Sequence, residues 1–211
     1  MPRSQPVLRT ARLRLVPLSD EHLDFEVTLD ADPDVMRFLG DGRPRTREQV
    51  EELHRRRLAT ARRVPGLGFW VGLVGSEFVG WWILEPPDRP DQGPVDGQAE
   101  LGYRLLPRFW RQGLAKAGAS ELVRYGFEEL GLKRIFAETM TVNGASRATM
   151  VAAGLRYEQT LFLDFAETIP GAELGEVVYA ITQSQWHSDR AGHSDHETPP
   201  SSLAGMGETG S

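Results

Sequence analysis

Residues 108–117, Arg-Phe-Trp-Arg-Gln-Gly-Leu-Ala-Lys-Ala, combine a glycine with three basic side chains at the expected start of a helix. The first backbone N–H groups of a helix have no partner within it and carry partial positive charge, so they can bind phosphate. Gly113 has no side chain to block that phosphate, and Arg108, Arg111 and Lys116 would surround it with positive charge. The segment therefore predicts a phosphate-binding turn. It lacks both the Gly-x-Gly-x-x-Gly pattern of dinucleotide sites and the Gly-Lys-Ser/Thr pattern of nucleotide triphosphatases.

Hydrophobic periodicity and turn residues divide the chain into strands and helices that must position this turn. We expect strands at 12–18, 69–74, 78–84, 98–106, 133–140, 155–165 and 175–183, and helices at 19–29, 32–39, 47–63, 112–130 and 144–153. The proline-rich segment 85–97 is typical of a flexible loop. Gly118 and Gly126 indicate that the helix 112–130 packs closely against a sheet. The pattern predicts an α/β (α+β) domain over residues 1–186 and a disordered tail over 187–211, which holds little to bury.

Composition narrows the function further. The chain has 211 residues, a net charge of −6 and no cysteine, so disulfides, thiolate nucleophiles and cysteine-based metal sites are excluded. No apolar run reaches the roughly 18 residues of a membrane span, and no signal-peptide core follows Met1, so we expect a cytoplasmic protein without a membrane partner. An acidic balance also argues against nucleic-acid binding. His187, His193 and His196 lie in the expected tail and should be solvated, so no metal site is predicted.

Four segments together resemble one enzyme family. They are residues 32–40, 99–103 and 110–115, and residues 139–155 with Asn143 and Ser146. The expected order of strands and helices resembles that of the GNAT acyltransferase superfamily, and these four segments resemble its RimJ/RimL-like branch. The resemblance implies a central mixed, mostly antiparallel seven-stranded sheet, flanked by helices and splayed at its middle strands. It also implies an acetyl-CoA-dependent N-acetyltransferase without a metal, in which a primary amine attacks acetyl-CoA directly in a ternary complex.

The resemblance implies a set of residues that bind acetyl-CoA, the co-substrate. The residues placed at the pyrophosphate are Arg111, Gln112, Gly113, Leu114, Ala115 and Lys116, mainly through backbone amides. Lys116 could equally be an ordinary solvated lysine. The backbones of Leu105 and Leu106 would pair with the pantetheine arm as an added strand. Asn143 would contact the pantetheine amides, or serve only as a turn residue.

Catalysis requires a group that accepts the amine proton and a group near the leaving thiolate. Glu100 on the central strand is the first candidate base, and Glu138 on the neighbouring strand is the second. Glu100 could instead pair with Arg104, which is four residues on and on the same face of the strand. In many family members a tyrosine protonates the thiolate, but counting from Asn143 that position is Met150 here. The resemblance therefore suggests that the Ser146 hydroxyl hydrogen-bonds the sulfur instead. Alternatively, Ser146 merely starts a helix. Met150 also motivates an alternative, a noncatalytic CoA-binding or sensing module.

The acceptor is less well defined. Phe38, Trp82 and Glu138 could shape its pocket, although aromatic residues on strands are more often core. The acidic body and acidic 85–97 loop favour a cationic acceptor, either a protein N-terminus or a small amine. The family resemblance implies a possible homodimer through the C-terminal strands, and the apolar residues on both faces of strand 155–165 fit either a buried or an interface strand. These apolar residues are Leu161, Phe162, Leu163 and Phe165.

Overall fold

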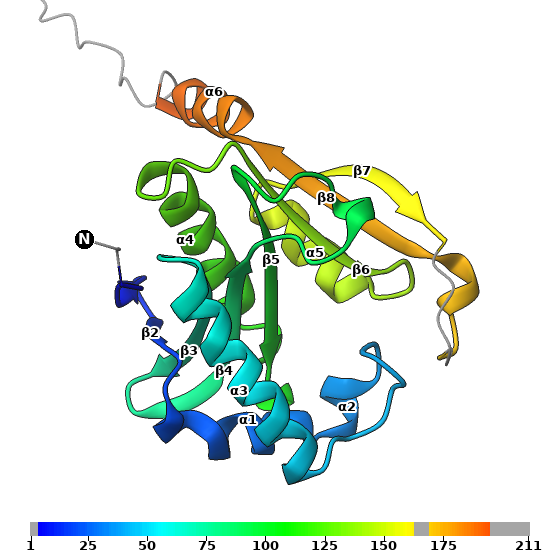
Figure 1. The fold of residues 1–211 in the computed structure, drawn as a ribbon. Coiled ribbons are helices and arrows are strands. Elements are labelled where there is room, and N and C mark those ends of the chain that lie inside the picture. The colour runs from blue at the N-terminus through cyan, green and yellow to red at the C-terminus, as the bar shows by residue number, and fades with distance from the viewer. Residues whose placement is uncertain (1–3, 163–168, 195–211) are drawn as a thin grey trace, which may run out of the picture.

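An eight-stranded mixed sheet forms the centre of the protein in a computed structural model that describes residues 4–162 and 169–194 (Figure 1). Its strand order is β1-β2-β3-β4-β5-β6-β8-β7, and the β5–β6 pair is the parallel one. The strands are β1 Leu8–Arg9, β2 Arg14–Pro17, β3 Gly68–Val74, β4 Glu77–Glu85, β5 Gln98–Leu105, β6 Arg134–Met140, β7 Arg156–Leu161 and β8 Glu176–Thr182. The predicted fold class is confirmed, but the predicted seven strands are one too few, because β1 has only two residues and shows no periodicity.

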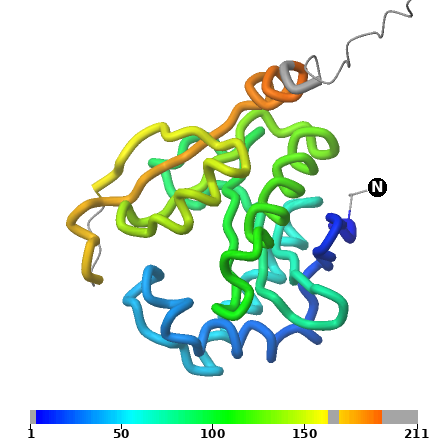
Figure 2. The backbone as a smooth tube through the Cα atoms, turned by 180° about the vertical axis from the view of Figure 1, so that it is seen from behind, coloured from blue at the N-terminus to red at the C-terminus, as the bar shows by residue number. Residues whose placement is uncertain are grey.

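Helices cover both faces of this sheet, with α3 crossing one face and α4 lying on the other (Figures 1 and 2). They are α1 Leu23–Asp30, α2 Pro33–Met36, α3 Arg47–Arg63, α4 Leu114–Glu128, α5 Gly144–Ala152 and α6 Gln183–Ser194. Helix α3 has the predicted bounds because Thr46 and Gln49 form a capping box at its start. Among the described residues, no helix is long and apolar enough to cross a membrane.

Buried charges, rather than apolar residues alone, fix α3 and α1 to the sheet. Glu26 of α1 contacts both His54 and Arg57 of α3, and all three side chains are buried. Asp30 at the end of α1 accepts from Arg45 at 3.0 Å and contacts Arg104 of β5. Burial alone would raise the pKa of Asp30, but the surrounding guanidinium groups outweigh it and lower the pKa below its ordinary value.

The middle of the sheet is splayed. Parallel pairing of β5 with β6 covers Gln98, Ala99 and Glu100, whereas β5 pairs with β4 as far as Leu105. Beyond Glu100 the two middle strands diverge, and β6, β7 and β8 separate from the first half of the sheet (Figures 1 and 2). The edge of β5 beyond Glu100 is therefore not paired with β6, as the family resemblance implies.

Helix α4 lies close to the sheet because Gly118 faces the indole ring of Trp82. A Cβ atom at Gly118 would lie 2.4 Å from Trp82 Cε2, while one at Gly144, in the first turn of α5, would meet nothing within 4 Å. We expect Gly118→Ala to lower the free energy of unfolding by about 1–3 kcal/mol through overpacking. Gly144→Ala is the control and should be neutral or stabilising. Thermal unfolding of both variants checks this, and equal midpoints would contradict the packing described.

The C-terminal segment differs from its prediction. Helix α6 runs to Ser194, so residues 187–194 are helical rather than disordered. Trp186 is buried against Phe127, with ring centroids 5.7 Å apart, and Asp189 accepts from Arg156 at 2.8 Å. Long-range contacts thus stabilise a helix that its polar composition does not indicate. The predicted disorder of 195–211 concerns residues outside the described range.

Strand β7 lies at the edge of the sheet and is shorter than the predicted strand 155–165. Tyr157 is 56% exposed and Phe162 is 75% exposed. Leu163 and Phe165, which the sequence pattern predicts to add apolar surface, lie outside the described residues. The homodimer through this edge stays a prediction.

Candidate active site

The start of α4 has the geometry of an anion-binding turn. Gly113 is the N-cap with a left-handed φ of 76°, and Arg111 is also left-handed at 57°. The first intrahelical bond runs from Ala117 N–H to Gly113 O at 2.9 Å, so the N–H groups of residues 114–116 precede it and point out of the helix. A Cβ at Gly113 would meet nothing within 4 Å, so the turn faces open space. A non-glycine residue in this conformation is strained, as is common where backbone is shaped for a ligand.

Side chains from three segments hold this turn in place. Arg12 Nη1 donates to Gln112 O at 2.9 Å, and Gln112 Nε2 donates to Arg108 O at 2.8 Å. Arg108 also pairs with Glu77 at 3.2 Å, so its guanidinium group lies beside the β3–β4 turn. Arg111 and Lys116 are exposed beside the helix start. Their help in binding a phosphate stays a prediction.

Of the two β5 residues predicted to pair with the pantetheine arm, Leu105 and Leu106, the structure favours only Leu105. Leu106 N–H donates to Val79 O at 2.9 Å, and Leu106 O accepts from Phe109 N–H at 3.0 Å. Both backbone groups of Leu106 are thus used within the protein, so its predicted pairing with a pantetheine arm is wrong. Leu105 O accepts from Trp110 Nε1 at 2.8 Å. Because the N–H of Leu106 points toward β4, strand alternation directs the N–H of Leu105 away from β4, toward the side of β5 where β6 diverges.

Glu100 occupies the point where the middle strands diverge. It is the last β5 residue paired with β6, opposite Phe136, and it lies across from Glu85 of β4. Its Oε2 accepts from Gln92 Nε2 at 2.9 Å. Burial, followed by the nearby carboxylates of Glu138 and Glu85, raises the pKa of Glu100 to about 8. A carboxyl group that can gain and lose a proton near neutral pH suits general base catalysis.

The alternative role for Glu100, an ion pair with Arg104, is not found. Arg104 contacts Asp30 instead, and its guanidinium lies 4.7 Å from the centre of the Trp81 ring. The two residues share a face of β5, as the sequence suggests, but the end of α1 provides a carboxylate for Arg104. Only the tertiary structure could reveal this competitor.

Glu138, the second candidate base, is held by Arg89 of the loop between β4 and β5. Arg89 also pairs with Asp91 at 3.1 Å. Burial raises the pKa of Glu85 to about 7 and also raises the pKa of Glu176. Because Glu138 is in direct contact with the cationic Arg89, it is the weaker candidate base. Its predicted contact with the substrate stays a prediction.

Helix α5 brings Asn143 and Ser146 together near β5. Asn143 is the N-cap residue: its Oδ1 accepts from Ser146 N–H at 3.2 Å, and its Nδ2 donates to Thr139 Oγ1 at 3.1 Å. Tyr103 donates its hydroxyl to Ser146 O at 2.9 Å and lies 3.3 Å from Ser146 Oγ. Met150 is buried in the core. The capping role is thus present at Asn143, and the CoA contacts of Asn143 and Ser146 stay predictions.

Tyr103 is a site residue that the sequence does not reveal. It lies on β5, and burial raises its pKa to about 12, so the phenol is neutral at physiological pH. Its hydroxyl reaches α5, 43 residues along the chain. An aromatic residue on an expected strand signals core packing, and nothing in its spacing indicates a polar partner.

The predicted acceptor residues separate into two groups. Trp82 is fully buried, and its Nε1 donates to Ala115 O at 3.2 Å, so its predicted role in an acceptor pocket is wrong. It instead supports the first turn of α4 from below. Phe38 is half-buried after α2, with the Arg37 guanidinium 4.4 Å from its ring centre. Its predicted contact with the acceptor is untested.

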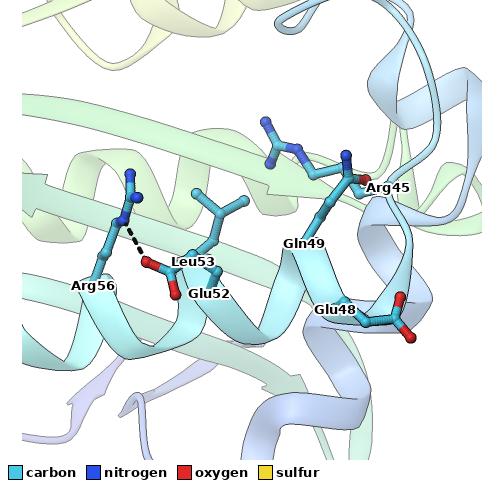
Figure 3. Close-up of a pocket in the computed structure, with 6 residues that line it drawn as sticks. All are labelled: Arg45, Glu48, Gln49, Glu52, Leu53 and Arg56. Atoms are coloured by element: carbon cyan, nitrogen blue, oxygen red, sulfur yellow. Dashed lines mark hydrogen bonds and ion pairs between the residues drawn. The ribbon is translucent and has the colours of Figure 1, made fainter.

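A surface hollow on α3 contains none of the predicted site residues (Figure 3). Its lining residues are Arg45, Glu48, Gln49, Glu52, Leu53 and Arg56. Several of these side chains form interactions within α3: Arg56 Nε donates to Glu52 at 3.0 Å, and Gln49 caps the helix start. We therefore assign the chemistry to the splayed strands and not to this hollow. Over the part of the chain that the structure describes, no cluster of three or more potential metal ligands is present.

Comparisons with known proteins agree with this geometry. The acetyltransferase (GNAT) domain model matches residues 12–156. FsC-acetyl coenzyme A-N(2)-transacetylase of Aspergillus fumigatus is 48% identical over 187 residues, 87% of this chain and 79% of that protein. A putative acetyltransferase from T. thermophilus has a TM-score of 0.68 at 27% identity, over 91% of this chain and 97% of that one. The RimL ribosomal L7/L12 alpha-N-protein acetyltransferase in complex with coenzyme A shares the fold, with a TM-score of 0.70 at 17% identity over 84% and 98%. The chain therefore belongs to the GNAT family and is an acetyltransferase.

Proposed function

We propose that this enzyme transfers the acetyl group of acetyl-CoA directly to the primary amine of a small cationic acceptor, with Glu100 as the general base. The observation that carries the proposal is the place of Glu100 at the last paired residue of β5, where the two halves of the sheet separate. The open helix start of α4 supports a pyrophosphate site, and the N–H of Leu105, which strand alternation directs away from β4, supports pairing with the pantetheine arm. Leu105 ends the strand that carries Glu100, and α4 follows it after a short turn.

The proposed reaction uses one carboxylate and one hydroxyl. Glu100 accepts a proton from the amine, whose nitrogen attacks the thioester carbonyl carbon; the N–C bond forms and the C–S bond breaks. The sulfur leaves as a thiolate, accepts a hydrogen bond from Ser146, and later takes a proton from solvent. Tyr103, whose hydroxyl lies 3.3 Å from Ser146 Oγ, orients that serine. Met150 supplies no proton to the leaving thiolate. The thiolate is only weakly basic, so one hydrogen bond is enough to stabilise it as it leaves.

Acidic side chains favour a cationic acceptor. Glu85, Glu100 and Glu138 occupy positions on one face of neighbouring strands, and the carboxylates of Glu138 and Glu85 both oppose ionisation of Glu100. An ammonium group arriving beside them would relieve this repulsion. The name of the Aspergillus fumigatus relative specifies acetylation at an N2 nitrogen, which supports a small-molecule amine over a protein N-terminus. We retain the RimJ/RimL-like branch as a proposal on the motifs of the sequence.

The activity should depend on pH through Glu100. Since the pKa of Glu100 is about 8, its carboxyl is largely protonated at neutral pH and becomes a base as the pH rises. We expect kcat/KM to increase with pH and to level off above about pH 8, measured with an acceptor whose amine is already neutral across this range. A flat profile between pH 6, about two units below that pKa, and pH 9, about one unit above it, would contradict the assignment of the base.

The alternative is a noncatalytic CoA-binding module, suggested by Met150 in place of the usual tyrosine. Release of free thiol from acetyl-CoA, measured with a panel of cationic amines, neutral amines and N-terminal peptides, separates the two. The enzyme should release thiol fastest with cationic small amines. Binding of CoA without thiol release across the panel would support the module, and release with peptides alone would overturn the proposed acceptor class.

A further inference from the structure

The loop between β4 and β5 is structured where the sequence suggests flexibility. A short turn at Pro90–Gln92 directs the side chain of Gln92 inward, and that side chain is 6% exposed. In Figure 1 the loop runs over the α3 side of the sheet and reaches toward β6 and β8. The contact between Arg89 and Glu138 of β6 fixes the same region. The loop thus lies over the face of the sheet that carries Glu100.

The amide of Gln92 has one possible orientation. Its Oε1 accepts from the backbone N–H groups of Asp88 at 2.9 Å and Arg89 at 3.2 Å, while its Nε2 donates to Glu100 Oε2 at 2.9 Å. A flipped amide would place its NH₂ group against two N–H donors and its oxygen against a carboxyl oxygen. The loop backbone therefore fixes which end of Gln92 meets Glu100.

A second buried glutamine holds the loop without contacting Glu100. Gln98 Nε2 donates to Gln92 O at 3.1 Å, and Gln98 Oε1 accepts from Arg134 Nη1 at 2.6 Å. Gln98 is 4% exposed. The two residues have the same side chain and similar burial, but different partners. They therefore form a matched pair for separating loop anchoring from the bond to Glu100.

The charges around Glu100 make the Gln92 bond important. The carboxylates of Glu138, Glu85 and Asp88 oppose ionisation of Glu100, and Arg89 is already paired with Glu138. A hydrogen bond donated to a carboxylate favours its charged form. It also occupies Oε2, so Oε1 is the oxygen that can turn toward an amine. Gln92 thus acts on both the charge and the orientation of the carboxyl group.

We propose that Gln92 is a positioning residue for Glu100, through which the loop between β4 and β5 favours the ionised carboxylate and fixes the oxygen that accepts the amine proton. This inference rests on the proposed function for its catalytic consequence. It makes the conformation of residues 86–97 part of the active site. A loop movement that withdraws Gln92 would therefore raise the pH at which Glu100 can act as a base.

The test is a titration of Glu100 in the full-length protein by carbon NMR of its side-chain carboxyl, assigned by its loss in Glu100→Gln. Gln92→Met should make Glu100 roughly tenfold or more harder to ionise, because a charged group loses its donor. Gln98→Met, the matched control, should leave the titration unchanged. Gln92→Asn, which is too short to reach Glu100, serves if the methionine variant does not fold and should give the same shift. An unchanged titration in the Gln92 variants would overturn the inference.

Rate profiles separate this inference from the proposed function. The rise of kcat/KM with pH should move to higher pH in Gln92→Met by the same interval as the NMR titration, and should not move in Gln98→Met. A shift in the titration without a shift in the rate profile would leave the coupling between Gln92 and Glu100 standing. It would overturn Glu100 as the base instead.

Discussion

Replacing Glu100 with glutamine should lower kcat for acetyl transfer roughly 100- to 10,000-fold, the usual contribution of a general base. The amide keeps the size and the hydrogen-bonding capacity of the side chain, so the strand and the helix start of α4 should be undisturbed. Binding of CoA, measured by calorimetry, should therefore match that of the unmodified enzyme. Equal turnover in the variant would remove Glu100 from the mechanism.

Glu85 provides the matched control, because it lies opposite Glu100 on β4 and is also a buried carboxyl group. Glu85→Gln removes one of the charges that oppose ionisation of Glu100, so it should shift the pH–rate profile toward lower pH and leave maximal kcat within a few-fold. Loss of activity in both variants to the same extent would show that the acidic face matters only as a whole.

Glu100→Gln should also change stability in a pH-dependent way. The folded-state pKa of about 8 lies above the ordinary value of 4.5, so the folded protein binds the proton more tightly than the unfolded chain. Stability contributed by the protonated carboxyl is therefore lost as the pH rises from 4.5 toward 8. The amide cannot ionise, so thermal unfolding should favour the variant more at pH 9, about one unit above that interval, than at pH 5, near its lower end. The opposite order would contradict the raised pKa.

The second large effect concerns the helix start of α4. Gly113→Asp should raise KM for acetyl-CoA roughly 10-fold or more, because its carboxylate would lie beside the proposed pyrophosphate site, where like charges repel. Asparagine and aspartate both tolerate the left-handed conformation that Gly113 adopts at φ 76°. Gly113→Asn is therefore the control for shape and should change KM much less.

Salt dependence distinguishes repulsion from misfolding in these two variants. Raising the ionic strength should narrow the difference between Gly113→Asp and Gly113→Asn, since an exposed charge is screened within about 10 Å at 0.1 M salt. Both variants should unfold at similar temperatures. If aspartate and asparagine raised KM equally at low salt, the site would not be one for an anion.

Local sequence signals predict the parts of the structure that depend on local interactions. Helix α3 lies where its pattern indicates because its capping residues and its charged repeat are contiguous. The proposed phosphate-binding turn can be picked out in the sequence because a helix start, a glycine and basic residues lie within ten positions. The position of Glu100 at the splay follows from the family resemblance rather than from periodicity, which cannot show where two strands separate.

The remaining errors involve partners far apart in the chain. Arg104 is held by Asp30, which lies 74 residues away, so the suggested pair with Glu100 does not form. The sequence alone allows Trp82 of β4 to line a pocket, but Gly118 of α4 lets the helix approach closely enough to cover its ring completely. Gln92 lies in a segment whose prolines and glycines indicate a loop, and no local pattern shows that its side chain reaches β5. Such contacts are decided by how the elements pack, which short-range patterns do not encode.

We propose that acetyl-CoA occupies the splay between β5 and β6 with its pyrophosphate at the start of α4. A crystal structure of the complex with CoA would show this directly. We expect pyrophosphate oxygens within hydrogen-bonding distance of the N–H groups of residues 114–116. We also expect a pantetheine arm paired with the N–H of Leu105 and a sulfur near Ser146. CoA bound elsewhere, with the edge of β5 beyond Glu100 uncovered, would contradict the proposal.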